Sequence, residues 1–132
     1  MKKEFSTSWK SSKKKRKQRK YRFNAPLHIK NKFLSANLNK ELRKKYSVRS
    51  LPVRKGDLVK IMKGKFRGKT GKVESVDVKN LKVSVEGMQR QKKAGAKINV
   101  YFDSSNLQIQ ELNLEDKERE KILLRKKAEK KI

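Results

Sequence analysis

Cysteine is absent from the 132-residue sequence, which excludes disulfide bonds and thiolate metal ligands and fits a reducing compartment. No run approaches the roughly 20 apolar residues that a membrane helix needs, and residues 1–20 lack the apolar stretch of a secretory signal. Histidine occurs once, at His28, so the sequence offers no His pair for a metal. We therefore expect no membrane insertion, no metal and no cofactor.

Acidic residues are scarce. The chain has 13 Asp and Glu against 40 Lys and Arg, a formal net charge of +27 at pH 7. Small soluble domains usually mix both signs and stay within about eight charges of neutrality. A chain this positive binds polyanions, which predicts a nucleic-acid partner. Because the few acids are scattered, we expect Asp57, Glu74, Asp77 and Glu86 to lie on the surface, and we predict neither an enzyme nor a small-molecule substrate.

Only 33% of the residues are hydrophobic and 40% are charged, too little apolar material for a core along the whole length. The charge and hydropathy patterns divide the chain into four parts. These are a basic tail at 1–22, a helical region at 23–51, a β region at 52–112 and a C-terminal helix at 113–132.

The basic tail has one acid, Glu4, and we expect it to be extended and disordered in isolation because its like charges repel. Trp9 is its one large apolar residue besides Phe5. An aromatic side chain among cations can stack on an RNA base, or it can pack on the protein's own domain, and the sequence leaves both open.

The helical region is predicted to hold two short helices. Pro26 suits a first helical turn, and Asn39 can cap the second helix. Leu38, Leu42 and Tyr46 recur at spacing four and should form its buried stripe.

The β region alternates apolar and polar residues, as half-buried strands do. Five short strands are expected, around residues 58–62, 73–76, 81–85, 98–102 and 107–109. This number favours a small closed barrel over a flat sheet with exposed edges. In the C-terminal helix, Asn113 and Asp116 are expected to form a capping box, and Glu115 an ion pair with Arg119. Ile122 and Leu123 offer little to pack, so its end should fray or lie against RNA.

The segment Lys55–Val73 contains a loop in which every second or third residue is cationic, interspersed with Gly64, Gly68 and Gly71. Glycine permits positive φ and close backbone approach, so backbone N–H groups and flexible cations can hold the same phosphates. Phe66 is expected to fold back onto the core. A P-loop requires four residues between its first glycine and Gly-Lys-Ser/Thr and a helix after it, whereas here three residues intervene and a strand follows, which argues against nucleotide binding.

This segment resembles the KOW motif, and the flanks Phe23–His28 and Lys40–Arg54 resemble one ribosomal family. It is the universal large-subunit family numbered twenty-four in bacteria and archaea and twenty-six in eukaryotes, in its archaeal and eukaryotic branch. The resemblance spans residues 19 to about 126. The chain departs from the family at Asp103 and Ser104, where members usually have His and often Pro.

The resemblance implies a mainly β chain with a small SH3-like barrel, short N-terminal helices and a C-terminal helix. It implies a structural constituent of the large ribosomal subunit in the cytoplasm, which binds the 5′ domain of large-subunit rRNA, supports early assembly, and lies beside neighbouring ribosomal proteins near the peptide tunnel exit. The loop Gly87–Lys97 corresponds to a hairpin near that exit, with Arg90, Lys92, Lys93 and Gly95. The residues expected to bind rRNA are Arg16, Lys17, Arg19, Lys20, Arg22, His28, Arg43, Arg49, Arg54, Lys63, Lys65, Arg67, Lys69 and Lys72.

Two other classes remain open at this point. A KOW-type transcription factor acting on RNA polymerase would need a companion domain and would be found with polymerase. A free polyanion-binding or membrane-active protein is compatible with the charge, although the patterned strands argue against it.

Overall fold

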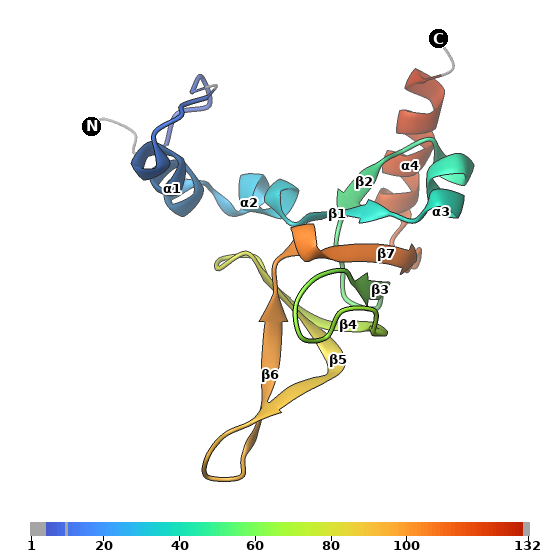
Figure 1. Ribbon diagram of the computed structural model, residues 1–132. Coiled ribbons are helices and arrows are strands. Elements are labelled where there is room, and N and C mark those ends of the chain that lie inside the picture. Colours follow the sequence, from blue (N-terminus) through green and yellow to red (C-terminus); the bar gives the residue numbers. More distant parts are fainter. Residues whose placement is uncertain (1–4, 10, 131–132) are drawn as a thin grey trace.

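The computed structural model describes residues 5–9 and 11–130 (Figure 1). The helices are α1 (Lys15–Asn24), α2 (Leu27–Phe33), α3 (Lys40–Tyr46) and α4 (Lys117–Glu129), and a short 3₁₀ turn spans Ser104–Asn106. The strands are β1 (Ser35–Leu38), β2 (Ser50–Pro52), β3 (Leu58–Ile61), β4 (Thr70–Asp77), β5 (Lys82–Gln91), β6 (Lys97–Phe102) and β7 (Leu107–Glu111).

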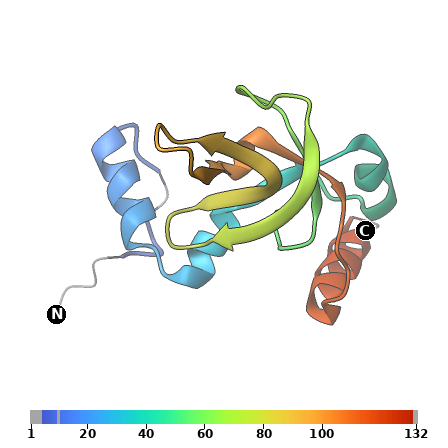
Figure 2. The ribbon, with the colours of Figure 1, turned by 90° about the horizontal axis from the view of Figure 1, so that it is seen from below.

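One strongly curved sheet organises the chain, with α1 and α2 on one side and α3 and α4 on the opposite side (Figures 1 and 2). The seven strands follow the order β2-β1-β7-β3-β4-β5-β6, and all neighbours are antiparallel except β1 and β7. The mainly β class, the small SH3-like fold and the flanking helices are confirmed. The predicted five strands are β3 to β7, but the barrel is not closed, because β2 and β6 end the strand order within the described residues.

The two additional strands lie in the region predicted to be purely helical. Leu38 was expected on a helix, but it is fully buried in β1 and pairs with Ile109 of β7. The helical repeat applies only from Asn39 onwards, whose side chain accepts a hydrogen bond from the Leu42 N–H at 2.8 Å, as a helix cap does. Leu42 and Tyr46 of α3 then pack against the core as predicted.

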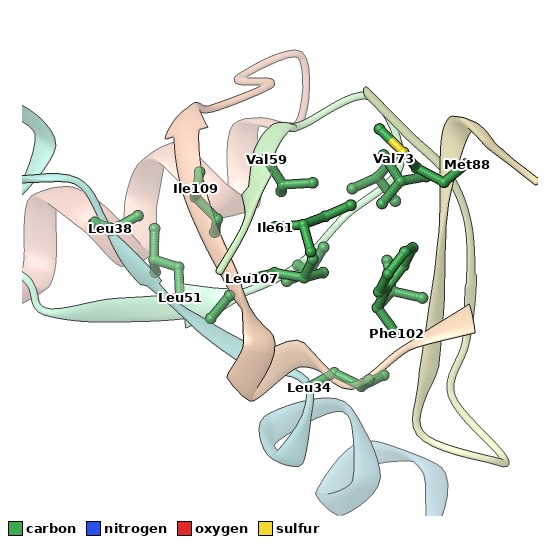
Figure 3. Packing of buried hydrophobic residues seen from close by; sticks show 14 of the residues in the cluster. Leu34, Leu38, Leu51, Val59, Ile61, Val73, Met88, Phe102, Leu107 and Ile109 are labelled. Atoms are coloured by element: carbon green, nitrogen blue, oxygen red, sulfur yellow. The ribbon is translucent and has the colours of Figure 1, made fainter. Parts of the chain in front are cut away.

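The hydrophobic core lies inside the curved sheet (Figure 3). Val59 and Ile61 of β3 and Leu107 and Ile109 of β7 are completely buried there. They alternate with polar neighbours, which is the pattern from which the strands were predicted. The Asp77–Asn80 turn between β4 and β5 is also as predicted, and the side-chain hydrogen bond from Asn80 lowers the pKa of Asp77.

The basic tail differs from the expectation of an extended segment, because Lys15–Asn24 form α1. This helix buries none of its own residues. Its contact with the chain is aromatic: Trp9 stacks on Tyr21 at 4.6 Å between ring centroids, and Tyr21 lies 5.9 Å from Phe33 of α2. The structure therefore has Trp9 packed on the protein's own residues.

Helix α4 is fixed to the sheet by a buried ion pair that the sequence analysis missed. Asp57, expected on the surface, is 0% exposed, and both of its oxygens accept from Arg119 at 2.6 and 2.7 Å. Arg119 thus pairs with Asp57 and not with Glu115. The helix cap is Asp116, not Asn113, and Leu123 is 2% exposed in the core, so α4 does not simply fray.

Candidate nucleic-acid interface

The loop between β3 and β4, residues 62–69, carries the cations that the KOW resemblance singled out. Two tight turns shape it: Arg67 N–H donates to the Gly64 carbonyl at 3.1 Å and Lys69 N–H to the Phe66 carbonyl at 3.1 Å. Gly64 and Gly68 have φ of 93° and 85°, a region that side chains disfavour. The four cations of the loop are exposed, as is the adjacent cation of β4, and they are Lys63, Lys65, Arg67, Lys69 and Lys72.

Gly71, the third glycine of the motif, has a different role from the other two. It lies in β4, opposite Val59 of β3, and its φ is not positive. A Cβ at this position would stand 2.8 Å from Val85 Cγ1 and 3.0 Å from the Glu86 carbonyl oxygen. Gly71 is therefore required for close packing of β4 on β5, whereas Gly64 and Gly68 have open space around them and are required for turn conformation.

Phe66 anchors the loop, as predicted. Its ring meets Phe102 edge to face, with centroids 6.0 Å apart, and it packs on the core. Lys69 Nζ lies 5.3 Å from the centre of the same ring, a cation–π contact. The packing of Phe66 on the core fixes the position of the loop on the sheet, while the cationic side chains of the loop stay in solvent.

The tip of the β5–β6 hairpin extends away from the other strands of the sheet (Figure 1). The predicted loop Gly87–Lys97 is shorter in the structure, because β5 continues to Gln91 after an irregularity in its pairing with β6. Arg90 therefore lies on a strand. Lys92, Lys93 and Gly95 form the tip, closed by hydrogen bonds from Lys92 N–H to the Ala96 carbonyl and from Gly95 N–H to the Lys92 carbonyl.

The remaining predicted site residues lie on α1, on α2, on and after α3, and before β3. Those of the tail all lie exposed on α1, far from the hairpin tip (Figure 1), and they are Arg16, Lys17, Arg19, Lys20 and Arg22. His28 on α2 and Arg49 after α3 are also exposed. Arg43 is half-buried, and its Nε is buried without a hydrogen-bond partner in the described structure. Arg54 is engaged by Asp116 at the start of α4.

Four acidic side chains lie around the start of α4. Glu115, Asp116, Glu118 and Glu120 surround the beginning of α4, on the side of the sheet opposite to α1 (Figure 2). The β3–β4 loop, between Ile61 and Thr70, contains no acid at all. The β3–β4 loop is thus purely cationic, whereas α4 mixes charges of both signs.

Residues 5–9 and 11–130 contain neither a membrane-spanning helix nor a cluster of metal ligands. No helix there is long and apolar enough to cross a membrane. No three His, Asp or Glu side chains in this part of the chain are grouped so as to hold a metal ion.

Comparison with known proteins addresses the flanks as well as the KOW segment. Residues 12–126 match the model of a family described as the eukaryotic ribosomal proteins L26 and their archaeal L24 counterparts. The chain belongs to this L26/L24 ribosomal family. The match begins before residue 19, where the resemblance noted from the motifs begins, and includes the whole of α1.

Individual relatives of the L26/L24 family agree. The "Large ribosomal subunit protein uL24" of Methanosphaera stadtmanae is 46% identical over 115 residues, covering 87% of this chain and 98% of the relative. That of Methanothrix thermoacetophila is 47% identical over 114 residues, covering 86% and 98%. That of Korarchaeum cryptofilum is 46% identical over 110 residues, covering 83% and 84%. A KOW transcription factor and a free membrane-active protein are thereby set aside.

Proposed function

We propose that this member of the L26/L24 family is a structural constituent of the large ribosomal subunit and binds its rRNA without catalysing a reaction. The observation that carries the proposal is the β3–β4 loop, which presents four exposed cations on a backbone shaped by Gly64 and Gly68 and rooted in the core by Phe66. Exposed cations on α1 and on the β5–β6 hairpin provide two further positively charged sites.

The mechanism is electrostatic clamping. Lys and Arg neutralise phosphates and release condensed counterions, which supplies affinity but no base information. Specificity then comes from the fixed spacing of loop, hairpin and α1, which must match the shape of folded RNA. The buried ion pair of Asp57 and Arg119 contributes by fixing α4 to the sheet, which helps to keep this arrangement rigid.

The position in the subunit rests on the family resemblance. We assign the RNA target to the 5′ domain of the large-subunit rRNA, the place to the vicinity of the peptide tunnel exit beside neighbouring ribosomal proteins, and the time of action to early assembly in the cytoplasm. The β5–β6 hairpin supports this placement, because its tip, with Lys92 and Lys93, extends away from the other strands and can contact a part of the ribosome that they do not reach.

Salt dependence of RNA binding tests the proposal. The full chain is titrated against a transcript of the 5′ domain and against an unrelated transcript of equal length, at several KCl concentrations. The logarithm of the affinity should fall with the logarithm of salt by roughly 0.7 to 0.9 per phosphate contact, so that about ten contacts give a slope of about −7 to −9. The 5′ domain should stay preferred at high salt. A flat dependence, or equal affinity for both transcripts at every salt concentration, would refute the proposal.

A further inference from the structure

A groove lies between the β3–β4 loop and the edge of the sheet. Lys63, Lys65 and Phe66 of the loop line one wall, and Arg90 of β5 with Tyr101 and Phe102 of β6 line the other. Its volume is about 480 Å³. Binding sites for small organic ligands commonly have volumes of about 300 to 1,000 Å³, so this groove is large enough to hold one nucleotide.

Tyr101 presents its ring to solvent at the surface of β6. It is 56% exposed, whereas the next residue, Phe102, is 9% exposed in the core, because successive side chains of a strand point to opposite faces. Tyr101 lies on β6, the last strand in the sheet order, so one edge of its strand has no neighbour among the described residues. Phe66 and Phe102, which also line the groove, are in edge-to-face contact. The groove therefore offers an aromatic surface to solvent.

The rim of the groove is cationic. Lys63, Lys65 and Arg90 are exposed, and none of them forms an ion pair in the part of the chain that the structure describes. The groove's one acid, Asp103, is held by Lys82 at 2.6 Å. Asn106 also lines the groove, and its amide can both donate and accept hydrogen bonds.

We propose that this groove binds one unpaired RNA nucleotide, with its base stacked on Tyr101 and its phosphates held by Lys63, Lys65 and Arg90. Aromatic side chains beside cations form the arrangement by which proteins hold unstacked bases. A base inside a duplex cannot enter, because its faces are covered by its neighbours. The inference rests on the proposed rRNA-binding function and adds to it one site for a flipped-out or looped base, whereas the other contacts proposed above are to phosphates.

The test uses the full chain and a 12-nucleotide single-stranded RNA with 2-aminopurine at its centre, together with the duplex of the same strand. The fluorescence of 2-aminopurine falls when the base stacks. Tyr101→Leu should weaken binding of the single strand at least about fivefold, the lower bound for loss of one stacked base, and should reduce the quenching. The salt slope should stay unchanged, because no cation is removed.

Two matched variants control for other effects. Tyr101→Phe keeps an aromatic ring and should bind as the unmodified chain does. Phe23→Leu removes an aromatic residue that is 81% exposed on α1, outside the groove, and should also leave binding and quenching unchanged. Circular dichroism shows whether each variant is folded. Ultraviolet crosslinking of the unmodified chain to the same RNA gives an independent readout, with the adduct expected on Tyr101 or another groove residue.

The outcomes separate this inference from the function on which it rests. If the unmodified chain binds with a steep salt slope but Tyr101→Leu binds and quenches equally well, the groove is not a base site and the electrostatic function stands. If binding of the duplex depended on Tyr101 to the same degree, the proposal that the groove binds an unpaired base would also be wrong. If the unmodified chain binds no RNA, both proposals fail.

Discussion

Replacing Arg119 with methionine is expected to lower the free energy of unfolding by about 3 to 5 kcal/mol, because it leaves Asp57 charged and buried without its partner. Both side chains are nearly inaccessible, at 3% and 0% exposure. The free energy of unfolding of a small domain is only about 5 to 15 kcal/mol. If this chain is near the lower end of that range, the loss would unfold a large share of the molecules.

The size of this effect follows from how completely the pair is satisfied. Asp57 also accepts from the Arg54 N–H at 3.0 Å and the Asn113 N–H at 2.9 Å. Arg119 also donates to the carbonyls of Asn113 and Pro52 at 3.0 and 3.1 Å. The pair thus joins β2, the turn before β3, the segment between β7 and α4, and α4 itself. Removal of Arg119 therefore leaves the Asp57 carboxylate and two backbone carbonyls without this hydrogen-bond donor at the same time.

Urea denaturation measures the loss, and two variants make the result specific. Lys121→Met removes a cation of α4 whose bridge to Glu118 is solvent-exposed, and it should change stability by less than about 0.5 kcal/mol. In a double-mutant cycle, Asp57→Asn and Arg119→Met together should cost less than the sum of the single changes. A cost below about 1 kcal/mol for Arg119→Met would show that the buried pair does not hold α4.

Neutralising the five cations in and beside the β3–β4 loop is expected to lower the affinity for the rRNA 5′ domain by on the order of a thousandfold at 0.1 M salt. The variant changes Lys63, Lys65, Arg67, Lys69 and Lys72 to Gln. If each of these cations contacts one phosphate, the salt slope should become shallower by about 3.5 to 4.5. Titration of this variant against the 5′-domain transcript at several KCl concentrations gives both quantities. The fold should survive, because all five side chains are exposed.

A variant of equal net charge controls for simple loss of positive charge. It changes Lys117, Lys121, Arg125, Lys127 and Lys130 to Gln, five exposed cations in α4 and its C-cap, on the side opposite to α1. These cations are interspersed with acids, so their removal should change affinity by less than about tenfold and leave most of the slope. Equal losses in the two variants would mean that net charge alone matters and that the loop is not the principal contact.

The fold was predictable where the sequence carries a periodic signal. Alternation in Leu81, Val83 and Val85, and again in Ile98, Val100 and Phe102, located strands that the structure has at β5 and β6. Strand β2 was missed because it spans only three residues. Strand β1 was missed because its four residues, Ser35–Leu38, contain a single large apolar side chain, whereas the equally short β3 contains three. Leu38 was also read as helical because it lies four residues before Leu42, the spacing of a helical stripe.

The candidate site was predictable only in part, for a related reason. The loop cations and Gly64 and Gly68 form a local pattern, so their clustering was found from sequence. The burial of Asp57 depends on Arg119, 62 residues later, and no local pattern reports such a pair. The groove likewise combines residues of the β3–β4 loop with Tyr101 of β6, so its aromatic member was absent from the predicted site. The packing role of Gly71 required knowledge of how β5 lies against β4.

Sedimentation of a cell lysate on a sucrose gradient in moderate salt tests the central claim most directly, with this chain detected in each fraction. If the protein is a constituent of the large ribosomal subunit, it should travel with that subunit at about one copy each and remain after a salt wash, because buried RNA contacts are screened less than exposed ones. Recovery at the top of the gradient, or together with RNA polymerase, would contradict the account and leave only a basic RNA-binding fold.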